Sequence, residues 1–358
     1  MIYENPSLVL HTPEVSGSVT WKSPSNLAIV KYWGKHGRQL PGNASLSLTL
    51  SESCTETTVD YLTSQKPGQV SLSFTFEGRE EPAFEKRIKK FLESILEYFP
   101  FLTQLDLKIS SKNTFPHSSG IASSASSMSA ISLALCDIEN ELFQSLTKDK
   151  FYEKASFISR LGSGSASRSI YPVAAAWGFH SQVEGSSDLF AIPWQKEVDP
   201  VFHTFRDSIL IVSPKKKKVS SSAGHQLMDE NVYAPSRYKQ AYERMIHLVE
   251  AMKKGDVNTF GKISEDEALT LHALMMCSEP AYMLIEPGSV AIMKAVRSFR
   301  EEMGIPVFYS LDAGPNVHLL YPQNVEDKVH AFIDAQLLQY CYEGRVIHDK
   351  VGTGPVKL

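Results

Sequence analysis

The sequence has few cysteines and none of the cysteine patterns that identify a disulfide framework or a zinc site. Its 358 residues contain four, which lie far apart, with no C-x-x-C pair and no Cys/His spacing of the zinc type. We therefore expect Cys54, Cys136, Cys277 and Cys341 to be buried free thiols.

The sequence also lacks a long apolar run and an excess of charge of either sign. A membrane-spanning helix needs roughly 18 apolar residues, which no window approaches, and the first residues, MIYENPSLVLHTPEV, carry no secretion signal. Lys and Arg number 36 against 40 Asp and Glu, so the net charge of −4 gives no general attraction to nucleic acid or to an anionic membrane. We expect a soluble cytoplasmic protein, without nucleic-acid or membrane partners, that binds anions through local contacts.

Strand patterns dominate the first third of the chain. An apolar run ends at Val30, NASLSLTL (43–50) alternates in the manner of a half-buried strand, and TTVDYL and VSLSFTF indicate two more strands. Apolar residues at intervals of three or four then predict a helix from Phe84 to Tyr98, which Pro100 ends. A strand at 105–110 follows.

Helical patterns dominate the second half. We expect helices at 236–253, 256–276, 289–303 and 325–340, a strand at 207–213, and two strands around a turn within VFYSLDAGPNVHLLY. Pro193 and Pro200 flank a polar connection, so we expect one domain at 1–202 and another at 203–358. The irregular order and the hairpins predict an α+β fold with mixed or antiparallel sheets.

Serine is concentrated immediately before a helical pattern that begins near Ala122, in the stretch NTFPHSSGIASSASS. Free backbone N–H groups, hydroxyls and the positive end of a helix dipole all favour a phosphate, although serines that merely cap the helix would give the same composition. Neither G-K-[ST] nor G-x-G-x-x-G is present, which excludes the two common nucleotide-loop motifs. Three further polar loops with glycine, KYWGK, GSGSASRS and DAGPN, favour a shared site.

These loops, in this order, resemble those of the diphosphomevalonate decarboxylases, a branch of the small-molecule kinase superfamily that includes homoserine, mevalonate and galactose kinases. The resemblance runs from about Trp21 to the end of the chain, through SNLAIVKYWGK, NTFPHSSGIASSAS, GSGSASRS, KVSSSAGHQLM, SLDAGPNV and VGTGP. The serine loop alone indicates only the superfamily. KYWGK, GSGSASRS and DAGPN together indicate the decarboxylase branch.

The resemblance implies a two-domain GHMP-kinase-like fold with the active site in a cleft between the domains. It implies ATP-dependent conversion of mevalonate diphosphate to isopentenyl diphosphate, with release of ADP, phosphate and carbon dioxide, in the mevalonate pathway of isoprenoid biosynthesis. The 3-hydroxyl would be phosphorylated first. ATP and Mg²⁺ are the implied cofactors, and a homodimer is usual for the family.

Three residues carry the implied catalysis. Asp312 resembles the catalytic aspartate, Lys31 the lysine that accompanies it, and Arg168 the guanidinium that holds the substrate carboxylate together with Asn26. The alternatives are a turn-forming aspartate, a solvated lysine and an arginine in a structural ion pair.

Two anion sites are implied beside these residues. The substrate diphosphate would contact Tyr32, Lys35, Ser165 and Ser221, with most of the run Lys215–Lys218 left as a solvated face. The nucleotide would contact Ser118, Ser119, Gly120, Ala122, Ser123 and Ser124, with Ser123 or Ser124 reaching Mg²⁺.

Departures from the family pattern leave other reactions open. Ser222 and Ala223 stand where some members carry an arginine, Ser167 replaces a frequent cysteine, and His117 replaces a small residue in the serine loop. A weaker diphosphate site would permit a monophosphate substrate, and a plain mevalonate-type kinase is a further alternative. A catalytically silent nucleotide-binding protein is the alternative from a different class, against which the completeness of the loops argues.

Overall fold

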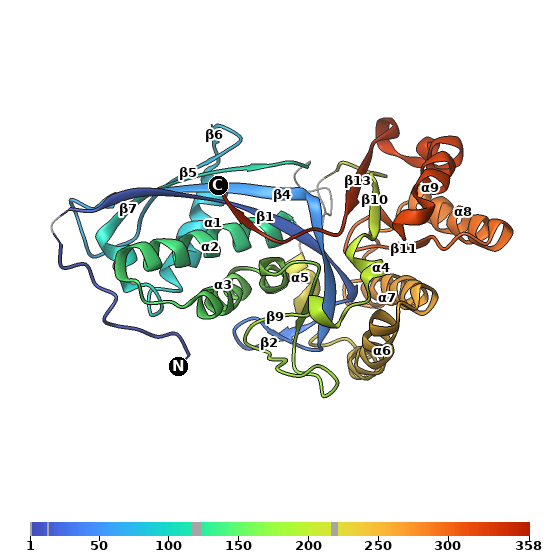
Figure 1. The fold of residues 1–358 in the computed structure, drawn as a ribbon, viewed down its shortest axis with the longest axis horizontal. Coiled ribbons are helices and arrows are strands. Elements are labelled where there is room, and N and C mark those ends of the chain that lie inside the picture. The colour runs from blue at the N-terminus through green and yellow to red at the C-terminus, as the bar shows by residue number, and fades with distance from the viewer. Residues whose placement is uncertain (1, 13, 116–122, 216–220) are drawn as a thin grey trace.

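The computed structural model describes residues 2–12, 14–115, 123–215 and 221–358, with the backbone alone at Ser221 and Ser222. Within these residues the chain forms two large sheets that are covered by helices, which confirms the α+β class (Figure 1). A short hairpin of β2 (Lys35–His36) and β3 (Leu40–Pro41) follows the first strand.

The first sheet has eight strands within the described part of the chain. Their order is β14-β1-β4-β7-β5-β6, and β8 and β9 extend the sheet beside β4. The bounds are β1 (Ser16–Val30), β4 (Ser45–Thr63), β5 (Ser71–Phe76), β6 (Arg79–Glu80), β7 (Leu105–Asn113), β8 (Ala174–Trp177), β9 (Ile192–Pro193) and β14 (Val356–Lys357). Neighbouring strands are antiparallel except β5 and β7, so the predicted mixed sheet is confirmed.

Three helices accompany the first sheet. α2 (Ser123–Phe143) lies along β1 and β4, and α3 (Lys148–Gly162) packs on α2 (Figure 1). A 3₁₀ segment, Gly164–Ile170, follows α3 and contacts both helices. α1 (Pro82–Glu93) packs on β5.

The helix predicted from Phe84 to Tyr98 is shorter than expected. Ser94 closes the last turn of α1, because its N–H donates to the carbonyl of Lys90 and its hydroxyl to that of Phe91. Tyr98 is buried, as its spacing indicated, but it lies in the turns that follow the helix.

The second sheet has the order β11-β12-β10-β13 and is antiparallel. Its strands are β10 (Arg206–Leu210), β11 (Phe308–Ser310), β12 (Val317–Tyr321) and β13 (Val346–Lys350). The accompanying helices are α4 (Pro200–His203), α5 (Ser221–Gln226), α6 (Ala234–Lys254), α7 (Val257–Met276), α8 (Pro287–Met303) and α9 (Glu326–Phe332). The predicted long helices are confirmed to within two residues at each end, and α9 continues as π and 3₁₀ turns to Tyr340.

The expectation of a half-buried strand at 43–50, separate from TTVDYL, is wrong. Both segments belong to β4, and every residue from Ser45 to Leu50 is buried. The polar face is covered as well, because Ser45 Oγ accepts a hydrogen bond from Arg168 and Thr49 Oγ1 donates to the carbonyl of Tyr171. The alternation therefore separates two buried environments rather than core from solvent.

One core joins the two parts of the chain. Leu27 and Ile29 of β1 and Leu46 of β4 pack with Met245 of α6 and Phe260 of α7. The end of β1 is therefore fixed against helices that lie more than two hundred residues later in the sequence.

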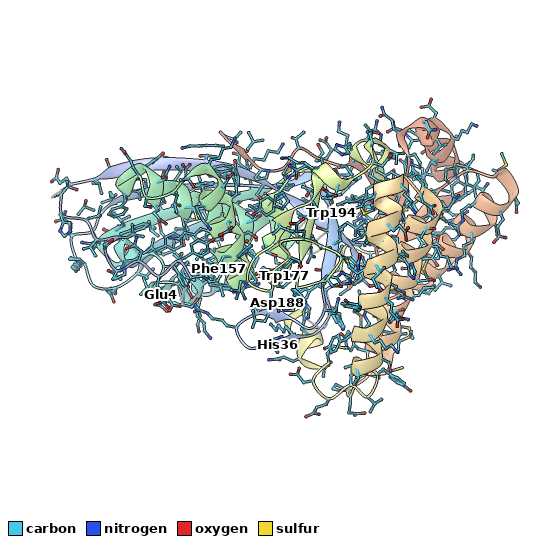
Figure 2. All side chains as sticks on the ribbon, turned by 60° about the horizontal axis from the view of Figure 1, so that its bottom comes forward. Glu4, His36, Phe157, Trp177, Asp188 and Trp194 are labelled. Atoms are coloured by element: carbon cyan, nitrogen blue, oxygen red, sulfur yellow. The ribbon has the colours of Figure 1, made fainter. Side chains whose placement is uncertain are left out.

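Two tryptophans labelled in Figure 2 mark where this core adjoins the core of the first sheet. Trp177 at the end of β8 belongs to the core under the first sheet, and Trp194 after β9 belongs to the core shared with α6. The pairing of Ala175 with Pro193 holds the two strands side by side.

Three of the four cysteines are buried free thiols, as predicted, but Cys277 is exposed. It follows the last residue of α7, where the helix end meets solvent. Of the helices described, none combines the length and the apolar character needed to cross a bilayer.

Candidate active site

A cavity of about 470 Å³ collects most of the residues that the sequence singled out. Its lining includes Asn26, Lys31, Tyr32, Lys35, Ser123, Ser124, Ser165, Arg168 and Asp312. They come from β1, the loop after it and β2, from the start of α2, from the segment after α3 and from the turn after β11. The predicted convergence of separate loops on one site is thus observed for these residues.

The remaining predicted residues lie outside what the structure describes. His117, Ser118, Ser119, Gly120 and Ala122 belong to the undescribed stretch before α2, and Lys216–Lys218 belong to the stretch before α5. Ser221 opens α5, but its side chain is not described.

Lys31 and Asp312 form an ion pair at one end of the cavity. Lys31 Nζ lies 2.9 Å from Asp312 Oδ1 and donates to Ser310 Oγ at 2.9 Å. The lysine side chain is 2% exposed and the aspartate side chain 24%, so the cation is buried while the carboxylate faces the cavity. Lys31 is therefore not a solvated surface lysine, and its ammonium favours the ionised form of the carboxylate beside it.

Arg168 brings a buried guanidinium to the same cavity. Its Nη1 donates to Ser45 Oγ at 2.7 Å, its Nε has no hydrogen-bond partner among the described residues, and Trp177 lies 5.8 Å from the guanidinium. Burial lowers the pKa of Arg168 to about 10, so the group is still a cation at neutral pH. No carboxylate of the described residues forms an ion pair with it, so the guanidinium has capacity for an anionic ligand.

Asn26 supports the segment that carries Arg168. Its Nδ2 donates to the carbonyl of Ser165 at 3.0 Å and to Ser169 Oγ at 2.8 Å. Its Oδ1 is buried without a partner in the described part of the chain. Both amide hydrogens are thereby engaged, so Asn26 has no amide hydrogen left to donate to a ligand.

The lining also includes His225, which was not predicted from the sequence although it lies in the motif KVSSSAGHQLM. Its ring lies between those of Tyr32 and Trp33, with centroids 4.3 and 4.6 Å away. Its Nδ1 accepts the N–H of Gly34, whose φ of +95° suits glycine, so the neutral ring carries its proton on Nε2.

Burial and the charge of Lys35 lower the pKa of His225 to about 3. The unfolded chain takes up this proton near pH 6.5, whereas the folded protein excludes it until about pH 3, so folding stability falls as the pH drops through this window. We expect the His225 contribution to reduce the free energy of unfolding by about 2 kcal/mol between pH 7 and 5. Urea titrations should show a correspondingly smaller acid loss for His225→Gln, while the exposed His36→Gln control behaves as wild type. An identical acid loss in wild type and His225→Gln would contradict this assignment.

Part of the cavity lining is aromatic, which the sequence did not reveal. Phe74 and Phe76 of β5 and Phe84 of α1 contribute to it together with Met128 and Ile131 of α2. Ser123, Ser124 and Ser127 of the first turns of α2 belong to the same lining. A lining that combines charged, hydroxyl and aromatic groups suits a ligand with both polar and apolar parts.

The hydroxyl groups at the start of α2 are compatible with a bound Mg²⁺ ion. Ser124 Oγ lies 3.3 Å from Ser163 Oγ, and both serines line the cavity. Within the described ranges no three His, Cys, Asp or Glu side chains gather as a metal-ligand set. Hydroxyl oxygens fit an ion that takes its other ligands from phosphates and water.

Comparison with protein families identifies two adjacent matches. Residues 23–189 match the diphosphomevalonate decarboxylase-like N-terminal domain, and residues 208–350 match the mevalonate 5-diphosphate decarboxylase C-terminal domain. The diphosphomevalonate decarboxylase of Debaryomyces hansenii is 30% identical over 322 residues, which are 86% of this chain and 80% of that protein. That of Saccharomyces cerevisiae is 31% identical over 334 residues, which are 89% and 81% of the two chains.

Solved structures agree with these matches. The mevalonate diphosphate decarboxylase of Staphylococcus aureus superposes with a TM-score of 0.82 at 27% identity, over 96% of this chain and 98% of that one. A structure described as MDDEF in complex with MVAPP, AMPPCP and magnesium gives a TM-score of 0.80 at 27% identity, over 96% and 99%.

Proposed function

The chain belongs to the diphosphomevalonate decarboxylase family, as the order of its loops predicted, and we propose from this premise that it converts mevalonate 5-diphosphate to isopentenyl diphosphate. ATP is consumed, and ADP, phosphate and carbon dioxide are released. The observation that carries the proposal is the convergence of the Lys31–Asp312 pair and the buried Arg168 on one cavity.

Asp312 is the proposed base for the 3-hydroxyl of the substrate. A tertiary hydroxyl is a poor nucleophile, so it must be held in line with the phosphoryl group while its proton is removed. The carboxylate faces the cavity, and Lys31 Nζ, 2.9 Å away, favours its ionised form. When bound, ATP with Mg²⁺ supplies the phosphoryl group that turns the hydroxyl into a leaving group.

Arg168 is the residue that we propose to bind the substrate carboxylate, which is lost as carbon dioxide. As the carbon–carbon bond to the carboxylate breaks, its electron pair forms the new double bond and phosphate leaves from C3. A guanidinium anchored by Ser45 can orient the carboxylate and release it once it becomes neutral carbon dioxide. Asn26 then serves by fixing the main chain at Ser165 and the side chain of Ser169, rather than by donating to the carboxylate itself.

Tyr32, Lys35, Ser165 and Ser221 are the proposed contacts of the substrate diphosphate, and His225 joins them as a neutral donor through Nε2. We propose that the serine loop, up to Ser124, binds the phosphates of the nucleotide, with Mg²⁺ at Ser123 or Ser124. The aromatic part of the cavity lining would contact the nucleotide base. The support is that the same cavity is lined by Tyr32, Lys35, Ser165, His225, Ser123 and Ser124, and that a structurally similar protein binds AMPPCP, an ATP analogue, with magnesium.

We further propose the division into domains at 202/203, a homodimer and a cytoplasmic location. The division is supported by the ends of the two family matches at 189 and 208. The dimer rests on the family resemblance, and the location on the composition of the sequence.

The proposal is tested by measuring carbon dioxide release with ATP and Mg²⁺ from mevalonate, its 5-phosphate and its 5-diphosphate. We expect release from the diphosphate at least about ten times faster than from the other two, because loss of one phosphate removes charge-assisted contacts worth at least 1.4 kcal/mol. Faster release from the monophosphate would establish the alternative substrate, and ADP formation without carbon dioxide would establish a kinase.

A further inference from the structure

The main chain of Lys31 is held from outside the cavity by buried charged groups. Glu267 Oε2 of α7 accepts the N–H of Lys31 at 2.8 Å. Arg237 Nη2 of α6 and Asn43 Nδ2 both donate to the carbonyl of Lys31, each at 3.1 Å. Lys31 follows the last residue of β1, so these contacts replace the strand pairing that ends at Val30.

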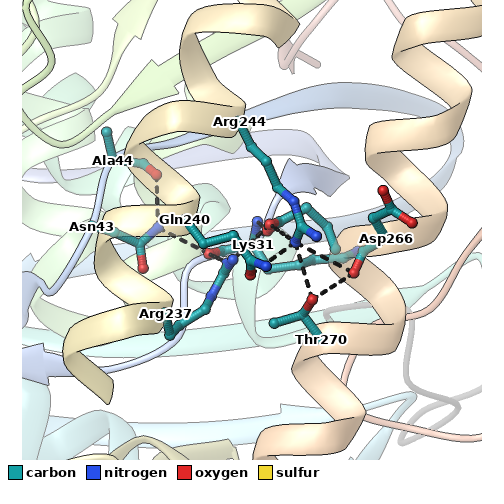
Figure 3. A network of polar contacts seen from close by, with 9 residues as sticks. Lys31, Asn43, Ala44, Arg237, Gln240, Arg244, Asp266 and Thr270 are labelled. Atoms are coloured by element: carbon teal, nitrogen blue, oxygen red, sulfur yellow. Dashed lines mark hydrogen bonds and ion pairs between the residues drawn. The ribbon is translucent and has the colours of Figure 1, made fainter. Parts of the chain in front are cut away.

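Glu267, Arg237 and Arg244 form a hydrogen-bonded cluster beside the main chain of Lys31. Figure 3 labels the two arginines and Lys31 within this network. Arg237 donates to both carboxylate oxygens of Glu267 at 2.6 Å, and Arg244 Nη1 donates to Oε1 at 2.7 Å. Arg244 is anchored in turn by Gln240, Thr270 and the carbonyl of Asp266. Although burial favours the neutral acid, the two arginines hold the pKa of Glu267 below its usual value.

Burying these charged groups carries a desolvation cost. The side chains of Arg237 and Glu267 are 1% and 0% exposed. A buried ion cluster is often no more stabilising than apolar residues of the same volume. The contacts to Lys31 give the cluster a function, because a misplacement of about 1 Å at a reacting group can cost about a hundredfold in rate.

We propose that Glu267 and Arg237 are positioning residues that fix the main chain of Lys31 so that its ammonium reaches Asp312. The inference rests on one part of the proposed function, namely that Lys31 assists catalysis. Neither residue lines the cavity, so neither contacts substrate or nucleotide.

The chain offers a matched control on the same helix. Glu265 is also a buried carboxylate with two arginine partners, Arg297 at 3.2 Å and Arg300 at 2.6 Å, but it faces α8 and makes no contact with Lys31. Glu265→Gln therefore removes a buried carboxylate with two arginine partners, which are more exposed than those of Glu267, without disturbing the site.

We expect Glu267→Gln to lower kcat about 10- to 100-fold while the KM values for both substrates stay within about threefold. Glu265→Gln should leave kcat within about twofold of wild type, even where both variants lower Tm. Arg237→Lys keeps the positive charge but loses the guanidinium group that donates to the Lys31 carbonyl, so it should show the same loss of kcat. It serves as the second variant if Glu267→Gln folds poorly.

A double-mutant cycle separates positioning through Lys31 from a general structural effect. In a Lys31→Met background, measured by single turnover, Glu267→Gln should cause no further loss of rate. A full additional loss there, an unchanged kcat in both single variants, or a rise of KM at constant kcat would overturn the inference. Each comparison uses the substrate that the wild-type protein decarboxylates or phosphorylates fastest. The test of Glu267 and Arg237 therefore does not depend on which reaction the substrate assay identifies.

Discussion

Replacing Asp312 with alanine or asparagine reduces carbon dioxide release from mevalonate diphosphate at least about a thousandfold, in the range found for loss of a general base. Asparagine keeps the size of the side chain and an oxygen for Lys31 Nζ, but it cannot accept the proton of the 3-hydroxyl. The turnover number with saturating ATP and substrate is the measurement. Retention of more than a tenth of the wild-type rate would contradict the role of Asp312.

Stability provides the control for this variant. Removing the carboxylate leaves the ammonium of Lys31, 2% exposed, without its ion-pair partner, which should cost about 3 kcal/mol. Combining Asp312→Asn with Lys31→Met removes both charges and should recover most of that stability while activity stays lost. A double variant that regains turnover would show that the pair acts through folding alone.

Arg168→Lys is expected to lower kcat/KM about a hundredfold or more. The guanidinium can donate to Ser45 through Nη1 and still direct Nη2 to a carboxylate, whereas one ammonium cannot serve both. Burial already lowers the pKa of Arg168 to about 10, and the same desolvation acting on a lysine would weaken its charge. Steady-state kinetics with mevalonate diphosphate measures the loss.

Arg160 is the matched control for Arg168. It is also a buried arginine whose pKa burial lowers to about 10, but it donates to the main-chain carbonyls of Leu189 and Arg38 and does not line the cavity. Arg160→Lys should therefore affect Tm more than kcat/KM. If Arg168→Lys and Arg160→Lys lose the same small amount of activity, Arg168 does not bind the substrate carboxylate.

Much of the site could be predicted because its main residues sit in short loops with recognisable order. Lys31, Arg168 and Asp312 each lie next to glycine-containing motifs, and the structure brings the three loops to one cavity. Several strands and the long helices also followed from periodicity.

What the sequence could not reveal depends on tertiary burial. Glu267 and Arg237 lie on helical patterns where charges ordinarily face solvent, and only the packing of α6 and α7 against the end of β1 buries them. The prediction of a half-buried strand at 43–50 was wrong for the same reason. An alternation with a period of two indicates that the two faces of a strand differ, but it does not show that one of them faces water. His225 was missed since nothing in its neighbours indicates that two aromatic rings enclose it.

The contacts around Lys31 also set when the enzyme becomes active during its synthesis. Lys31 bonds to Glu267 across 236 positions and to Asp312 across 281, and Trp21 pairs with Lys357 near the end of the chain. Contacts so distant in sequence form late, because the loops between them must first be closed. A nascent chain that ends before α6 would hold its lysine in an unfixed main chain, so the site is complete only after the segments that carry Arg237, Glu267 and Asp312 have been made.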